Sequence, residues 1–105
     1  MNTQKCQEIL LELLRVGLIA IRNLADIKSR DVRMNSRLIE WTTLCHSVPS
    51  ILLGRCDPRS VKYFIDGDAS AYLRIYPSKQ DTDFVQAVDL LKELEIAFQS
   101  SDFPP

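Results

Sequence analysis

Hydrophobic residues recur at spacings of three and four through most of this chain, which is the period of an α-helix. The first segment, about Thr3 to Ile27, is predicted to be one long helix with an apolar and a charged face. The apolar face carries Cys6, Leu10, Leu13, Gly17, Ile21 and Leu24, and the opposite face carries Glu8, Glu12, Arg15, Arg22 and Asp26. The apolar face is widened by Leu11, Leu14, Val16 and Leu18. We therefore expect a central scaffold helix with neighbours on two sides.

A second helix is expected after a polar connection at residues 28–31, with Asp31 or Asn35 as its N-cap. Pro49 lacks an amide hydrogen and disfavours helical geometry before it. This helix should therefore end near Ser47. Its inward positions are expected to be Leu38, Ile39, Thr42 and Cys45.

Asp57 followed by Pro58 is typical of a helix start, with an N-cap residue and a proline at the first helical position. Gly67 is expected to end this helix. Its inward residues are expected to be Val61, Phe64 and Ile65. Residues 69–76 fit either a short helix or a strand, because apolar and polar side chains alternate there.

A last helix is expected to reach about Gln99, capped at its start by Asp81, Thr82 or Asp83. Its buried stripe should comprise Phe84, Val88, Leu91, Leu94 and Phe98. The predicted fold class is therefore all-α, a compact bundle of four to five helices, with a β-ribbon near residues 69–76 as the alternative. Residues 1–100 are expected to form one helical domain, and residues 101–105 a frayed tail.

Composition places the chain among ordinary globular proteins: 105 residues, 46% hydrophobic and 26% charged. The three cysteines, Cys6, Cys45 and Cys56, are odd in number and widely spaced. This usage favours reduced, buried thiols in a cytoplasmic protein. The apolar run of residues 9–21 is interrupted by charged Glu12 and Arg15, so we expect neither a signal peptide nor a membrane span.

No arrangement of residues predicts catalysis or metal binding. Cys45 and His46 are adjacent, and neighbours on a helix point about 100° apart, which prevents shared chemistry. The run Asp66-Gly67-Asp68 lacks the later ligands of a calcium loop, so we interpret it as a helix stop with capping aspartates. We expect a protein that is not an enzyme and has no metal or cofactor.

Charge is unevenly distributed along the chain. Residues 1–60 carry nine basic and six acidic side chains, whereas residues 61–105 carry four basic and eight acidic ones. Asp89 and Glu93 are a like-charge i,i+4 pair on the last predicted helix, a local cost without a visible local benefit. The pattern therefore predicts an acidic surface for a cationic protein partner. Its residues are Asp81, Asp83, Gln86, Asp89 and Glu93.

An arginine-rich face is the alternative binding surface. Arg30, Arg33 and Arg37 lie on one side of the second predicted helix or just before it, where they could contact nucleic-acid phosphates. The net charge of −1 argues against a dedicated nucleic-acid binder. The candidate interface anchors are the aromatic residues with polar groups: Trp41, Tyr63, Tyr72 and Tyr76. Trp41 lies one position off the inward stripe and is expected to be partly exposed.

The stretch Cys45-His46-Ser47-Val48-Pro49, followed by Ile51-Leu52-Leu53, resembles a Leu-His-Asn-Ile-Pro element of small helical bacterial proteins. Some of those proteins are immunity proteins that neutralise toxins. His46, Val48 and Pro49 match the element, whereas Cys45 and Ser47 depart from it. The resemblance implies a compact helical fold, a binding role and a structural helix end at His46 and Pro49.

The sequence therefore predicts a non-enzymatic protein-binding module, most concretely an inhibitor or immunity protein. It would neutralise a cationic bacterial toxin through the acidic face of the last helix. The alternative is a small nucleic-acid-linked regulator that uses the arginine face.

Overall fold

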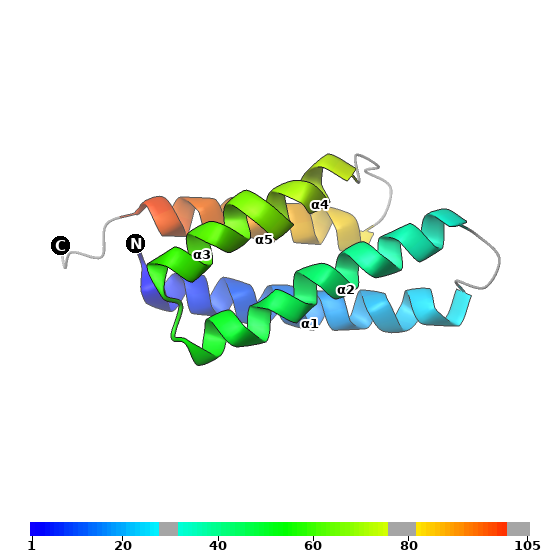
Figure 1. The fold of residues 1–105 in the computed structure, drawn as a ribbon, viewed down its shortest axis with the longest axis horizontal. Helices are drawn as coiled ribbons and strands as arrows, with labels where there is room; N and C mark the ends of the chain where they lie inside the picture. The colour runs from blue at the N-terminus through cyan, green and yellow to red at the C-terminus, as the bar shows by residue number, and fades with distance from the viewer. Residues whose placement is uncertain (28–31, 76–81, 101–105) are drawn as a thin grey trace.

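The computed structural model describes the backbone of residues 1–27, 32–75 and 82–100, and the side chains of residues 1–24, 38–72 and 85–100. Within these residues the chain is an all-α bundle of four helical rods, without a β-strand (Figure 1). The rods are α1 (Thr3–Ile27), α2 (Val32–Leu53), the continuous series α3 (Pro58–Phe64), η2 (Ile65–Ala69) and α4 (Ser70–Ile75), and α5 (Thr82–Gln99). The predicted fold class is confirmed.

The long helix α1 organises the bundle, because it packs against α2 on one side and α5 on the other. The α3–η2–α4 rod contacts both α2 and α5 and so completes the bundle. The backbone amide of Asn2 donates a hydrogen bond to the carbonyl of Ala97 at 2.9 Å. The start of α1 therefore lies beside the end of α5, and the two helices run antiparallel (Figure 1).

The predicted bounds and apolar face of α1 are confirmed. Along that face Cys6, Leu10, Leu13 and Leu24 are buried, Gly17 is buried and Ile21 is half-buried. The prediction that further side chains widen the apolar face of α1 is only partly correct. Val16 is buried, but Leu11 and Leu18 remain 61% and 54% exposed. The outer side of α1, where Leu11 and Leu18 lie, therefore stays uncovered in the described part of the bundle.

Helix α2 does not end at Ser47, contrary to expectation, but continues through Pro49 to Leu53. Pro49 lies on the exposed side, so its ring displaces no core side chain. Val48 and Ile51 are buried beyond the expected end, and their burial favours continuation of the helix despite the missing hydrogen bond. Asn35 lies inside α2 and is not its N-cap, whereas Asp31 lies outside the described residues.

The inward face of α2 also differs from the prediction. Ile39 is 62% exposed and Thr42 is exposed, while Leu38 is half-buried and Cys45 is buried. The buried stripe is instead Trp41, Leu44, Cys45, Val48 and Ile51. Trp41 is buried rather than partly exposed, and its ring packs against that of Tyr72 with centroids 5.1 Å apart. Because this contact comes from the α3–η2–α4 rod, the periodicity of α2 alone does not reveal it.

The α2–α3 connection uses two left-handed residues that are not glycine. Arg55 and Cys56 both have φ of 56°, whereas Gly54 does not have positive φ. The amides of Arg55 and Cys56 donate to the carbonyls of Leu52 and Ile51 at 3.0 and 2.9 Å, which closes the helix end in a Schellman arrangement.

Asp57 and Pro58 begin α3 as predicted, and the Asp57 carboxylate accepts a hydrogen bond from the Arg59 amide at 2.7 Å. Val61 and Phe64 are buried and Ile65 is half-buried, as expected.

Gly67 does not end this helix, because the chain continues through the π-helical segment η2 into α4. A π-helical turn accommodates an extra residue without breaking the rod, and a Cβ on Gly67 would meet open space. The described part of residues 69–76 is helical, so the β-ribbon alternative is wrong there.

Helix α5 spans Thr82–Gln99 and so reaches the predicted end. Along its stripe Leu91 and Leu94 are buried, and Val88 and Phe98 are half-buried against the core. The expected cap Asp81 and the side chain of Phe84 lie outside the described residues, as do residues 101–105.

Candidate functional site

The exposed side of α5 carries the central part of the predicted acidic surface. Gln86, Asp89 and Glu93 are all exposed, at spacings of three and four along the helix. Asp83 belongs to α5, but its side chain lies outside the described part of the structure, as does all of Asp81. We refer to Gln86, Asp89 and Glu93 as the acidic face.

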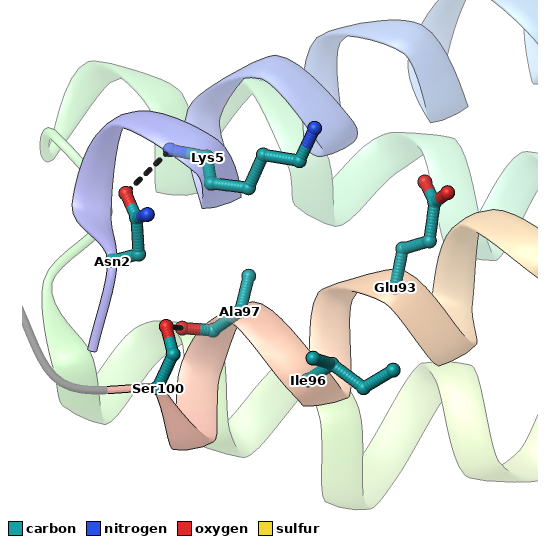
Figure 2. Close-up of a pocket in the computed structure, with 6 residues that line it drawn as sticks. All are labelled: Asn2, Lys5, Glu93, Ile96, Ala97 and Ser100. Atoms are coloured by element: carbon teal, nitrogen blue, oxygen red, sulfur yellow. Dashed lines mark hydrogen bonds between the residues drawn. The ribbon is translucent and has the colours of Figure 1, made fainter.

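The acidic face borders a shallow pocket between the start of α1 and the end of α5. The pocket has a volume of about 210 Å³ and is lined by Asn2, Lys5, Glu93, Ile96, Ala97 and Ser100. Figure 2 shows Lys5 of α1 and Glu93 of α5 on opposite walls, at the same end of the pocket. Ile96 is 67% exposed and supplies an apolar surface beside the Glu93 carboxylate.

Local hydrogen bonds hold both walls in place at one end of this pocket (Figure 2). The Asn2 side-chain oxygen accepts from the Lys5 amide at 3.0 Å, which satisfies an amide of the first turn of α1. The Ser100 hydroxyl donates to the Ala97 carbonyl at 2.9 Å at the other wall. Ala97 also accepts the Asn2 amide, so the two helix ends are joined directly.

The antiparallel register brings a further carboxylate near the acidic face. Glu12 lies seven residues, or about two turns, after Lys5 and so on the same side of α1. Asn2 contacts Ala97, and the two helices run antiparallel from that contact. Ten residues further along α1, Glu12 therefore lies level with the segment of α5 from Gln86 to Asp89. The pattern of α1 by itself places Glu12 only on the charged side of that helix, because the pattern of one helix carries no information about a neighbouring helix.

Glu12 is not an isolated charge, because it forms an ion pair with Arg15 one turn later. The Arg15 side-chain hydrogen bond lowers the pKa of Glu12, and the same contact raises the pKa of Arg15. Both side chains are exposed enough for solvent to screen this pair. In contrast, Asp89 and Glu93 form no ion pair with any side chain in the described part of the structure.

The Cys45-His46 pair has the arrangement predicted for adjacent helix residues: Cys45 is buried and His46 is exposed. Burial raises the pKa of the Cys45 thiol to about 11, so the thiol is protonated at neutral pH and a poor nucleophile. His46 is not at a helix end, because α2 continues to Leu53. The helix end implied by the resemblance is therefore not found.

Asp66 and Asp68 do not cap a helix end, contrary to expectation, because both lie inside the continuous rod. Asp66 accepts from the Lys62 ammonium at 2.9 Å, and Asp68 accepts from the Ser47 hydroxyl of α2. The two carboxylates therefore have separate partners. Within the described residues, no group of three or more histidine, cysteine, aspartate or glutamate side chains could hold a metal ion.

The side chains of the alternative arginine face lie outside the described residues. Arg33 and Arg37 belong to α2, but their side chains lie outside the described set, as does all of Arg30. Of the remaining candidate anchors, Tyr63 is 79% exposed on α3, Tyr72 is buried, and Tyr76 lies outside the described residues.

Comparison of the chain with known protein families, with curated proteins and with solved structures found no match. Among the described helices, none is both long and apolar enough to cross a membrane. On the surface of the bundle, the acidic face and its pocket combine exposed charge with an apolar contact.

Proposed function

We propose that this chain is a non-enzymatic binding module that recognises a cationic protein through the acidic face of α5. The observation that carries the proposal is the exposure of Asp89 and Glu93 together, without an ionic partner in the described part of the molecule. A like-charge pair one turn apart costs a helix a few tenths of a kcal/mol, and a cationic partner would offset that cost. Electrostatic attraction would also accelerate association with such a partner.

The surroundings of the acidic face support a protein partner. Val85 and Ile96 are exposed on α5, and Ile96 lines the pocket beside Glu93. Protein interfaces combine an apolar centre with polar groups around it, and arginine is enriched in them. A basic side chain could therefore place its apolar stem on Ile96 and its charge near Glu93.

The most concrete form of the proposal is an inhibitor or immunity protein that neutralises a cationic bacterial toxin in the cytoplasm. Its support is the short resemblance around His46, Val48 and Pro49, together with the acidic face. An inhibitor that covers the toxin's surface with a rigid helix needs no reactive side chains of its own. This agrees with the arrangement of Cys45, which is buried and protonated, and His46, which is exposed on another side of α2.

The decisive experiment reverses the charge of the acidic face. Asp89→Lys with Glu93→Lys should leave the fold intact, because both side chains are exposed. Where a cationic toxin domain is encoded next to this chain's gene, the variant should bind that domain about tenfold or more weakly than the wild type, mainly through slower association. This difference should shrink as salt screens the charges. Association rates measured at low and high ionic strength test both expectations.

A matched control changes the net charge equally at other exposed positions. Asp66→Lys with Glu95→Lys should retain near-wild-type binding, since Asp66 lies on the other rod and Glu95 on another side of α5. Unchanged toxin binding by the Asp89 and Glu93 variant would exclude the acidic face. Salt-sensitive binding of RNA or DNA, abolished by Arg33→Glu with Arg37→Glu, would instead favour the nucleic-acid alternative.

A further inference from the structure

The outer side of α1 carries a regular stripe that the bundle does not use. Its positions are Gln4, Glu8, Leu11, Arg15, Leu18 and Arg22, all exposed and alternately four and three residues apart. This spacing places the six side chains along one face of the helix. We call these six residues the outer stripe. Its two leucines lie seven residues apart, with charged residues between and beyond them.

A groove opens beside one half of the outer stripe. It has a volume of about 440 Å³ and is lined by Gln4, Gln7, Glu8, Leu11 and Leu52. Leu52, near the end of α2, is half-buried against the core, so the groove has apolar side chains from two helices. An apolar side chain placed there would lose contact with water on both sides.

We propose that the outer stripe is the contact surface of a homodimer in which α1 packs antiparallel to α1 of a second copy. Glu8 lies seven residues before Arg15, and Arg22 lies seven residues after it. A twofold axis at Arg15 therefore places Glu8 of each copy opposite Arg22 of the other. A parallel pair would instead place like charges opposite one another.

The same axis matches the apolar positions. It brings Leu11 of one copy opposite Ile19 and next to Leu18 of the second copy, and both of these side chains are exposed. Leu18 of the second copy then lies at the Leu11 side of the groove. The axis also brings the Arg15 side chains of the two copies together, and the Glu12 carboxylate paired with each of them offsets part of their repulsion. Glu8 and Arg22 form no ion pair with any side chain that the structure describes.

This dimer would be weak and would leave the acidic face accessible. A single helix pair buries less surface than a standard protein interface, so dimerisation should depend on concentration. The groove lies where α1 borders α2, whereas the acidic face belongs to α5 on the other side of α1. The proposal is independent of the proposed toxin binding, and the two can fail separately.

Sedimentation equilibrium over a range of concentrations tests the dimer. The wild type should pass from monomer to dimer, and Leu18→Gln should weaken the dimer about tenfold or more. Glu8→Arg alone and Arg22→Glu alone should each weaken it, because each places like charges opposite one another. The double variant Glu8→Arg with Arg22→Glu should restore it, because the swapped charges are again complementary. Tyr63→Gln, at an exposed position on α3, serves as the control and should leave the dimer unchanged.

Three results would overturn the proposal. The first is a wild type that stays monomeric up to about 1 mM, since an interface this weak would have no role as a dimer. The second is a double charge variant whose dimer is as weak as the dimers of the two single variants. This result would exclude the antiparallel register. The third is a dimer that Leu18→Gln leaves intact or that Tyr63→Gln disrupts equally. Circular dichroism establishes that each variant is folded, and the charge series decides the question even if Leu18→Gln unfolds.

Discussion

At the scale of single residues, Gly17 sets the distance between α1 and α2. A Cβ added at Gly17 would lie 2.1 Å from the Cys45 sulfur and 3.3 Å from Cε3 of Trp41. Glycine within a helix normally costs about 0.5–1 kcal/mol relative to alanine. At this position close packing against α2 requires the smallest residue. The free energy gained by this packing exceeds the cost of placing glycine within a helix.

We predict that Gly17→Ala lowers the free energy of unfolding by about 1–3 kcal/mol, the usual cost of overpacking a core. Cys45→Ala removes the sulfur that the new methyl group meets, so Gly17→Ala should cost clearly less in that background. Urea denaturation of the four proteins in a double-mutant cycle measures the coupling. Gly67→Ala is the control and should not destabilise through overpacking, because its Cβ would meet no other atom within 4 Å. Equal costs of Gly17→Ala in the two backgrounds would contradict this packing.

At the scale of helices, α2 persists through a proline. Pro49 cannot donate to the carbonyl four residues before it, and its ring crowds that carbonyl. The helix nevertheless continues, because buried Val48 and Ile51 on either side of Pro49 anchor it to the core. Tertiary packing therefore stabilises the last turn of α2 against an unfavourable local residue.

We predict that Pro49→Ala raises the free energy of unfolding by about 1–3 kcal/mol, because proline in a helix interior is about 3 kcal/mol worse than alanine. The exposed proline contributes no core contact that the substitution would remove. Thermal denaturation measures the gain, and Ser50→Ala, at the next exposed position, should change stability by well under 1 kcal/mol. A loss of stability in Pro49→Ala would show that α2 ends before this residue.

At the scale of the whole molecule, α1 is the element on which the bundle depends. It contacts both α2 and α5, and Leu13 on its core side is fully buried. Leu18, five residues later, lies on the outer stripe. The same residue type in one helix therefore has a packing role at one position and a surface role at the other.

We predict that Leu13→Ala lowers the free energy of unfolding by about 2–5 kcal/mol, through lost burial and the cavity it leaves. Leu18→Ala should cost under about 1 kcal/mol in dilute solution, where the proposed dimer is dissociated. Chemical denaturation of both variants at micromolar concentration provides the comparison. Similar losses of unfolding free energy in the two variants would mean that Leu13 does not lie on the core side of α1.

Features of the fold that depend on local rules could be predicted from the amino-acid pattern. The apolar period of α1 predicted its bounds and its core side, including Leu13. The pair Asp57 and Pro58 predicted the start of α3, because capping and proline geometry involve only neighbouring residues. The exposure of Asp89 and Glu93 followed from their place opposite the apolar stripe of α5. These signals repeat within one helix and need no knowledge of its neighbours.

Other features depend on long-range packing, which overrides some local preferences and brings distant segments together. Continuation through Pro49 depends on core contacts of α2, and burial of Trp41 depends on Tyr72 from another rod. Lys5 and Glu93 share a pocket because the antiparallel register joins segments almost ninety residues apart. Such pairings result from long-range packing, because the free energy of burial can exceed the preferences of single residues.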